Sequence, residues 1–332
     1  RLIWAPRAVF SATQQTGPMA ENPRWTEQDL PNLTGRQVIV TGANSGLGLC
    51  TAQALAKVGA NVTMAVRDLT KGEQARQQIL GDSGDSANVE VARLDLADLA
   101  SVREFAATWS AAHPGGLDLL INNAGIMAIP RKATADGFET QFGTNHLGHF
   151  ALTALLWPAL VARTYSRVVT VSSQAHRMGR MNWDDLMGEH RYSSWGAYGQ
   201  SKLANLLFTL GLQQRIDDAG LSILALAAHP GYASTNLQAA GPTMRGSGLG
   251  AKFVNVGNRI LAQPAQMGAL PTLYAATAPD LPNGSYIGPD GFLEQRGHPK
   301  VVDRSARAKD VQDANRLWVL SEELTGITFP IQ

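Results

Sequence analysis

The sequence predicts an α/β fold in which a doubly wound parallel sheet carries helices on both faces. From Gln37 onward, short and almost continuously apolar runs alternate with stretches of helical periodicity. Such runs are typical of parallel strands that are covered on both faces. A glycine-rich turn separates the first expected strand from the first helix. Right-handed crossovers between such strands then give a doubly wound sheet.

The expected elements follow one another in a regular order. Strands are predicted where Val, Ile, Leu and Ala dominate a short run, at 37–42, 61–67, 89–96, 117–125, 167–173 and 221–230. Helices are predicted where apolar residues recur with helical spacing, at 47–60, 71–80, 99–113, 137–161 and 196–219. We find no internal repeat at a period of about 20–50 residues.

The chain is predicted to form a single domain over residues 34–332, because no linker follows Thr34. Residues 19–33 are expected to form an N-terminal arm. Residues 1–18 precede Met19 and are interpreted as an upstream extension. Their apolar runs are interrupted by Arg and Pro, which fits a signal peptide poorly. A short amphipathic segment that touches a membrane is the alternative.

Composition excludes some classes of function. The net charge is +1, so no strong electrostatic field favours nucleic acid or an anionic membrane. No run of about 18 apolar residues predicts a transmembrane helix. Cys50 is the only cysteine, so no intramolecular disulfide forms. A reducing compartment is consistent with this, and we expect a cytoplasmic protein.

The stretch TGANSGLG, Thr41 to Gly48, leaves the first expected strand and enters the first helix. Glycines permit a tight turn and let a phosphate approach the backbone, and the helix N-terminus offers its free N–H groups. Three glycines could also form a turn alone, but the order of strand, turn and helix favours a Rossmann-type site. The predicted nucleotide-binding residues here are Gly42, Asn44, Ser45, Gly46, Leu47 and Gly48.

Two further positions bear on the nucleotide. Arg67 ends the second expected strand, where many NAD-binding sheets place an acid that accepts from the ribose 2′-OH. An arginine there favours the 2′-phosphate of NADP, although Asp68 follows it. We predict NADP(H) in preference to NAD(H). Asp95 and Leu96 would flank the adenine, or Asp95 would instead cap the next helix.

Several separated motifs together resemble those of the short-chain dehydrogenase/reductase family. They are TGANSGLG, LDL at 94–96, NNAG at 122–125, NHLGHF, VSS ending at residue 173, YGQSK and HPGYAST at 229–235. The glycine spacing is similar to that of the single-domain dehydrogenases. NHLGHF, SSQAHRMG and YGQSKLANLLF resemble the retinol-dehydrogenase-like subgroup. The tail GSYIGPDGFLEQRGHPK is similar to that of bacterial oxidoreductases of this kind.

The resemblance implies a catalytic set. Tyr198 would be the general acid/base, and Lys202, four residues later on the same helix face, would stabilise its phenolate and hold the nicotinamide ribose. Ser173 would hydrogen-bond the substrate oxygen, with Ser172 as its rival, since side chains alternate along a strand. Asn145 would bind a water that relays protons to Lys202, or would be a satisfied core amide.

The same resemblance implies contacts to the nicotinamide half of the cofactor. The residues concerned are Asn123, Ala124, Gly125, Pro230, Gly231 and Thr235. His146 and His149 stand three residues apart, but no third ligand accompanies them, so no metal is predicted. His176 and His229 receive no role.

The segment between Ser173 and Tyr198 is longer than in compact members of the family and resembles that of retinol dehydrogenases. We expect a substrate loop near 174–197 and a lid near 236–262. Soft and aromatic side chains of the loop could line an apolar pocket or could pack the loop onto the sheet, namely Met178, Met181, Trp183, Met187, Tyr192 and Trp195. The predicted substrate is a hydrophobic aldehyde or ketone, or the corresponding alcohol.

Alternatives remain at this stage. A redox sensor that binds NADP(H) without turnover would often lack the tyrosine or the lysine, and both are present here. A dehydratase or epimerase is disfavoured by the glycine spacing.

The resemblance implies a homodimer or homotetramer that pairs through the helices near 137–161 and 196–219. The small residues of the second helix would equally suit packing within one chain.

Overall fold

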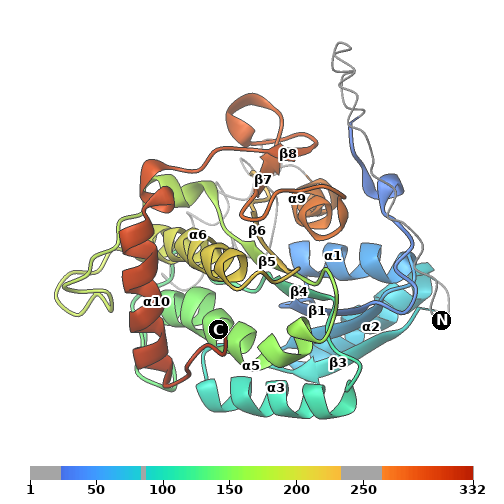
Figure 1. Cartoon of the computed structure of the whole chain (residues 1–332), viewed down its shortest axis with the longest axis horizontal. Helices are drawn as coiled ribbons and strands as arrows, with labels where there is room; N and C mark the ends of the chain where they lie inside the picture. The colour runs from blue at the N-terminus through green and yellow to red at the C-terminus, as the bar shows by residue number, and fades with distance from the viewer. Residues whose placement is uncertain (1–23, 84–86, 233–263, 332) are drawn as a thin grey trace, which may run out of the picture.

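A central eight-stranded sheet organises the protein in a computed structural model that describes residues 24–83, 87–232 and 264–331 (Figure 1). The strand order is β3-β2-β1-β4-β5-β6-β7-β8. The strands are β1 (Gln37–Thr41), β2 (Asn61–Val66), β3 (Val89–Arg93), β4 (Leu119–Asn122), β5 (Arg167–Val171), β6 (Leu224–Ala228), β7 (Tyr286–Pro289) and β8 (Pro299–Val301).

The doubly wound parallel sheet predicted from the sequence is confirmed. Strands β1 to β7 pair in parallel, and only the edge strand β8 runs antiparallel, beside β7. The direction of the strand order reverses between β1 and β4. This reversal is the switch point at which ligands bind in such sheets. Several strands end earlier than predicted, because buried residues such as Leu94 and Leu96 continue into the loops at the carboxyl edge.

Helices cover both faces of the sheet (Figure 1). One face carries α1 (Gly46–Lys57), α2 (Leu69–Ser83) and α9 (Ala265–Thr277), and the other carries α3 (Leu99–Ala112), α5 (Gly148–Val161) and α6 (Ser194–Asp218). Strand residues alternate between the two resulting cores. Val38 and Val40 pack into the first core, whereas Ile39 packs into the second.

The helix expected over 137–161 is interrupted near its start. A short α4 (Thr140–Phe142) passes into a π-helical turn, Gly143–Leu147, before α5 begins. Asn145 lies in this wider turn. Such turns are frequent at functional sites because they redirect a side chain from the regular helix.

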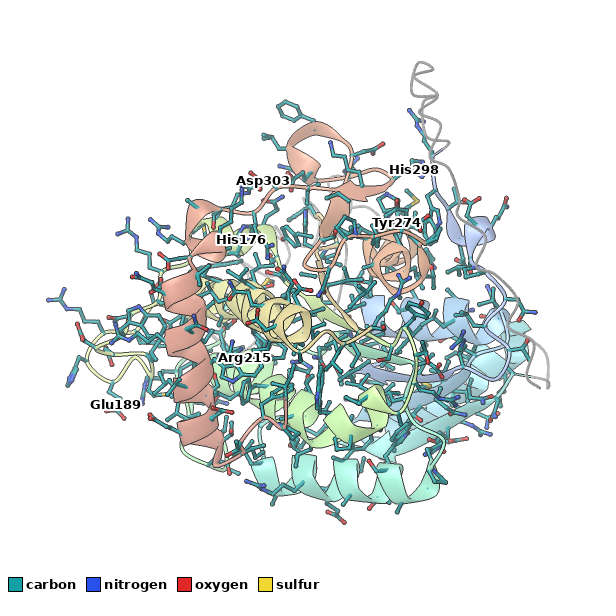
Figure 2. The ribbon with its side chains drawn as sticks, viewed as in Figure 1. His176, Glu189, Arg215, Tyr274, His298 and Asp303 are labelled. Carbon is teal, nitrogen blue, oxygen red and sulfur yellow. The ribbon has the colours of Figure 1, made fainter. Side chains whose placement is uncertain are left out.

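The C-terminal helix α10 (Val311–Thr325) packs against α6 (Figure 1). Trp318 lies against the rings of Phe150, Phe208 and Phe329. The guanidinium of Arg215 stacks on Trp318 at 4.0 Å, and Figure 2 shows it beside α10. Part of α6 is therefore covered by α10 of the same chain, and pairing of two copies through α5 and α6 stays a prediction.

Short 3₁₀ helices complete the described structure: η1 (Glu27–Asp29), η3 (Gln174–Arg177), η4 (Phe292–Glu294) and η5 (Ala306–Lys309). The described part of the N-terminal arm packs onto α9 through Trp25. Its ring lies edge-on to the ring of Tyr274, with the ring centroids 5.3 Å apart. His298, which Figure 2 labels close to Tyr274, hydrogen-bonds through Nδ1 to the Trp25 carbonyl at 3.0 Å. Among the described helices, none combines the length and the apolar character needed to cross a membrane.

Candidate active site

The glycine turn forms a close-packed cradle at the N-terminus of α1. Gly42 and Gly46 have positive φ angles of 65° and 55°, which favour glycine. A Cβ on Gly48 would lie 2.4 Å from the Gly42 carbonyl oxygen. Ser45 is the N-cap residue, but its side chain makes no capping hydrogen bond, whereas Asp98 caps α3 with its carboxylate. The first N–H groups of α1 are therefore available to a phosphate.

The ends of β1 and β4 are tied together beside this cradle. The Thr41 hydroxyl accepts from the backbone N–H groups of Asn123 and Ala124, each at 2.9 Å. The Asn123 amide donates to the Thr41 carbonyl at 2.8 Å. Asn123 and Ala124 thus hold the floor of the crevice, and a Cβ on Gly42 would already touch Ala124 at 3.0 Å. The sequence indicated no such role for Thr41.

Arg67 and Asp68 lie just beyond the end of β2, which pairs with β1 beside the glycine turn. Arg67 is exposed. The Asp68 carboxylate faces α2, where it accepts from the Lys71 N–H at 3.1 Å and lies 3.6 Å from the Lys71 ammonium. The backbone hydrogen bond from Lys71 lowers the pKa of Asp68. Asp68, the acid that directly follows Arg67, is thus engaged with α2.

Asp95 and Leu96 follow β3. The helix α3 is capped by Asp98, so the alternative that Asp95 caps it is wrong. The Asp95 carboxylate instead accepts from the Ala97 N–H at 3.0 Å in a local turn. Leu96 is buried, and a Cβ on Gly148 would lie 2.4 Å from its carbonyl oxygen. Contact of Asp95 and Leu96 with adenine stays a prediction.

Tyr198 and Lys202 lie one turn apart in the first half of α6, and both are buried. The ammonium is 5.8 Å from the centre of the phenol ring and donates to the Val171 carbonyl at 3.0 Å. Burial raises the pKa of Tyr198 to about 12, against a smaller lowering by its hydrogen bond with Ser173. Burial also lowers the pKa of Lys202 to about 8. The expected lowering of the Tyr198 pKa by Lys202 is therefore not found: loss of hydration raises this pKa, and the lowering contribution comes from Ser173.

The two candidate serines face different ways. Ser173 caps η3, accepting from the Ala175 N–H at 3.2 Å, and its hydroxyl lies at the phenol of Tyr198. Ser172 is buried and donates to the main-chain carbonyl of Lys202 at 2.8 Å. The structure therefore brings Ser173, and not Ser172, to the tyrosine hydroxyl.

The Asn145 side chain is held by three hydrogen bonds. Its amide oxygen accepts from the Ile126 N–H at 2.9 Å, and its amide nitrogen donates to the Ile126 carbonyl and to Ser201 Oγ. It thereby fixes the loop after β4 and places Gly125 beside Lys202, whose ammonium would lie 3.5 Å from a Cβ at that glycine. These hydrogen bonds give the Asn145 side chain a structural role. Its binding of a water that relays protons to Lys202 stays a prediction.

His146 and His149 bind different partners. His146 Nε2 lies 2.9 Å from Ser321 Oγ, whereas His149 lies between the Asn145 carbonyl and the Thr41 hydroxyl. Burial lowers their pKa values to about 3 and about 4, so both are neutral. Within residues 24–83, 87–232 and 264–331, no three metal-binding side chains come together.

Comparison with known proteins identifies the family. The family model described as short chain dehydrogenase matches residues 36–245. Retinol dehydrogenase 12 of Mus musculus is 42% identical over 297 residues, which cover 89% of this chain and 88% of the relative. The chain belongs to the short-chain dehydrogenase family. It is a retinol-dehydrogenase-like oxidoreductase with a Rossmann fold, as the sequence motifs predicted.

Two solved structures are similar to this short-chain dehydrogenase. An uncharacterized protein from Mycobacterium paratuberculosis is 51% identical, with a TM-score of 0.76 and coverage of 92% of this chain and 99% of that one. A protein described as an NAD(P) dependent gluconate 5-dehydrogenase, from Beutenbergia cavernae and with NADP bound at low occupancy, is 26% identical. Its TM-score is 0.58, with coverage of 77% of this chain and 95% of that one.

Most of the soft side chains in the substrate loop pack inward. Met181, Trp183 and Met187 join a core cluster with residues of α6 and α10, and the Tyr192 hydroxyl donates to the Ile129 carbonyl at 2.9 Å. Trp195 differs, because it is 47% exposed and its ring lies edge-on to Tyr198, with centroids 6.1 Å apart.

These positions decide between the two expectations for the loop side chains, which were to line an apolar pocket or to pack the loop onto the sheet. For Met181, Trp183, Met187 and Tyr192, packing of the loop is the observed role. Met178 is 63% exposed, and no interaction places it at the tyrosine. Trp195 is thus the aromatic side chain of the loop that lies beside Tyr198, the predicted acid/base of this dehydrogenase.

Pro230 and Gly231 follow β6, and Gly231 has a positive φ of 64°. Thr235 and the predicted lid at 236–262 lie outside the described residues. The sequence interpretation missed a polar cluster next to Gly231, formed by Gln174, His229 and Glu294. Only the adjacency of Gln174 to Ser173 could have indicated it.

Proposed function

We propose that this short-chain dehydrogenase transfers hydride between NADP(H) and an apolar aldehyde or ketone, or the corresponding alcohol. One observation carries the proposal. Tyr198 has Ser173 as a hydrogen-bond partner, and Lys202 follows one turn later with its ammonium bound to the Val171 carbonyl at the end of β5. These groups occur together at the carboxyl edge of the sheet, beside the glycine cradle, where a nicotinamide nucleotide binds in this fold.

The preference for NADP(H) rests on the end of β2. A phosphate on the adenosine ribose would meet the exposed Arg67, since Asp68 is turned toward Lys71. Two charge-assisted hydrogen bonds from a guanidinium suit a phosphate better than a ribose hydroxyl. The similar structure from Beutenbergia cavernae, described as NAD(P) dependent, holds NADP at low occupancy, which supports binding of this nucleotide in the fold.

The residues fit the nucleotide and divide its binding. The uncapped N-terminus of α1 and the close approach at Gly48 suit the pyrophosphate. Gly125 keeps space in front of the Lys202 ammonium, which could then reach ribose hydroxyls. When bound, the nucleotide supplies or accepts the hydride.

Proton transfer falls to Tyr198. Because burial raises its pKa to about 12, the phenol is protonated at neutral pH and can donate to a carbonyl oxygen that receives hydride at carbon. Ser173 would hold that oxygen at the phenol. In the oxidative direction the phenol must first lose its proton, which the nearby charge of Lys202 favours.

The apolar character of the substrate is supported by Trp195. Its half-exposed ring borders Tyr198, and an apolar group near the reacting carbon would bury the rest of that ring. The similarity to a retinol dehydrogenase points to the same class of substrate.

The test measures oxidation of NADPH and of NADH with a panel of apolar aldehydes and ketones. Tyr198→Phe should reduce kcat by at least about a hundredfold, the usual contribution of general acid–base catalysis. Tyr165→Phe is the matched control, because Tyr165 is 75% exposed and lies in the connection between α5 and β5. A Tyr198→Phe enzyme with near wild-type turnover would refute the assignment.

A further inference from the structure

A buried histidine and a loop glutamate connect the ends of two central strands. His229 directly follows β6, and its side chain is completely buried. Glu294 ends η4, in the loop between β7 and β8. Neither residue has a role in the hydride and proton transfers described above.

The hydrogen bonds of His229 define its tautomer. Nδ1 accepts from the Gly231 N–H at 3.2 Å, so the ring proton lies on Nε2, which donates to Glu294 Oε2 at 3.1 Å. Gly288 of β7 makes this approach feasible, since a Cβ there would collide with Nε2. The imidazole therefore transmits the position of the Glu294 carboxylate to the Gly231 peptide, as a carboxylate orients histidine in many sites.

The same carboxylate holds the segment that follows β5. Gln174 Nε2 donates to Glu294 Oε2 at 2.5 Å, and Gln174 is the residue after Ser173. Arg177 Nη2 lies 3.5 Å from Glu294 Oε1. One carboxylate is thus bound to both sides of the proposed site, the serine side and the glycine side.

The loop that presents Glu294 has an unfavourable backbone. Leu293 and Glu294 have φ angles of 50° and 56°, a left-handed region that costs energy for residues other than glycine. Such conformations persist where surrounding contacts impose them, and they concentrate at functional sites. The Gln295 carbonyl adds to these contacts by accepting from the Tyr232 N–H at 2.8 Å.

We propose that Glu294 is a positioning residue for catalysis. Through His229 it fixes the Gly231 peptide, and through Gln174 it fixes Ser173, so that the nicotinamide and the substrate oxygen keep one relative geometry. This inference rests on the proposed function, since Gly231 and Ser173 matter in this way only if a nicotinamide and a carbonyl bind there.

The test compares Glu294→Ala with Glu294→Gln in the whole protein. Glutamine keeps an oxygen that accepts from His229 and from Gln174, whereas alanine removes both acceptors. Asp303→Ala is the matched control, because Asp303 is an exposed carboxylate nearby, labelled in Figure 2, that pairs with Lys309 and not with His229. Melting temperatures of all variants are recorded beside the other readouts.

Three readouts distinguish positioning from folding. Hydrogen–deuterium exchange of the Gly231 amide needs no cofactor. Binding of NADPH is compared with binding of 2′,5′-ADP, which lacks the nicotinamide. Turnover is measured with the best carbonyl of the panel. Glu294→Ala should speed the exchange and lower kcat by about tenfold to a hundredfold, the usual range for a lost hydrogen bond to a charged group. Its affinity for 2′,5′-ADP should stay within about twofold of wild type, because the adenosine half binds elsewhere.

Glu294→Gln should keep kcat within about threefold of wild type, since its acceptor remains. The proposal is overturned if Glu294→Ala leaves both the exchange and kcat unchanged, or if Glu294→Gln is as impaired as Glu294→Ala. If the wild-type protein reduces no carbonyl with NADPH, the proposed function fails, while the exchange comparison still decides whether Glu294 holds Gly231.

Discussion

Replacing Lys202 by Met should stabilise the folded protein near neutral pH while it removes the proposed activity. The Lys202 side chain is 3% exposed, and burial lowers its pKa from 10.5 to about 8. Keeping the ammonium charged in the folded state near pH 7 therefore costs about 3 kcal/mol. Methionine has a similar length and no charge. The Val171 carbonyl, which accepts from Lys202, still accepts from Asn205 Nδ2 at 3.1 Å.

The net gain in the free energy of unfolding of Lys202→Met should be smaller than the cost of keeping the ammonium charged. Loss of the Lys202 hydrogen bond removes about 1 kcal/mol, so a rise of about 1–2 kcal/mol in the free energy of unfolding is expected near pH 7. The sign of the pH dependence follows from the two pKa values. Between pH 8 and 10.5 the unfolded chain binds more protons at this lysine than the folded chain, so the wild type gains stability as pH rises. The advantage of Lys202→Met is therefore full below pH 8 and is lost toward pH 10.5.

Urea unfolding of wild type and Lys202→Met near pH 7 and near pH 9.5 measures this directly, and the difference between them should shrink by about 2 kcal/mol. Lys57→Met is the control, because its side chain is 42% exposed and lies on the surface of α1. It should change stability by less than about 0.5 kcal/mol at either pH. A Lys202→Met protein that is less stable near pH 7, or whose advantage does not depend on pH, would refute the reasoning.

Three further predictions test the cofactor, the substrate wall and the core. Arg67→Asp should weaken NADPH binding by about tenfold to a hundredfold and NADH binding by less than about threefold, since only NADPH has the 2′-phosphate; calorimetry with both nucleotides decides this. Trp195→Ala should raise KM for long apolar aldehydes by about tenfold, because the ring loses its apolar contact; an equal effect on acetaldehyde would contradict this. Trp318→Ala should lower the free energy of unfolding by about 3–5 kcal/mol, as its ring is buried among three aromatic side chains; a loss below 1 kcal/mol in urea unfolding would show that α10 is not part of the core.

The parallel sheet and the cradle could be predicted because their signals are local in the sequence. Each strand is an apolar run, and the glycine turn needs only its own neighbours to form. The helix α10 gave no comparable signal, because Trp318 packs against Phe150 and Phe208, which come from distant parts of the chain. Its amphipathic pattern does not indicate which surface it covers.

The candidate site was predicted unevenly for physical reasons. Alternation along a strand shows that one of Ser172 and Ser173 faces the site, but only the fold shows that Ser172 turns to the Lys202 carbonyl. In the substrate loop, residue types alone could not show which side chains line a pocket and which pack into the core, because methionine and tryptophan occur in both places. The contact between His229 and Glu294 joins two loops far apart in sequence, so no spacing could reveal it.

The central claim is that Tyr198 protonates a carbonyl oxygen while hydride passes from NADPH to the adjacent carbon. The most direct measurement uses NADPH with deuterium at the transferring position, an apolar aldehyde, and mass spectrometry of the product, for wild type and Tyr198→Phe. We predict one deuterium in the alcohol formed by the wild type and almost no alcohol from the variant, although the variant still binds NADPH. Deuterated alcohol formed at a similar rate by both proteins would contradict the claim.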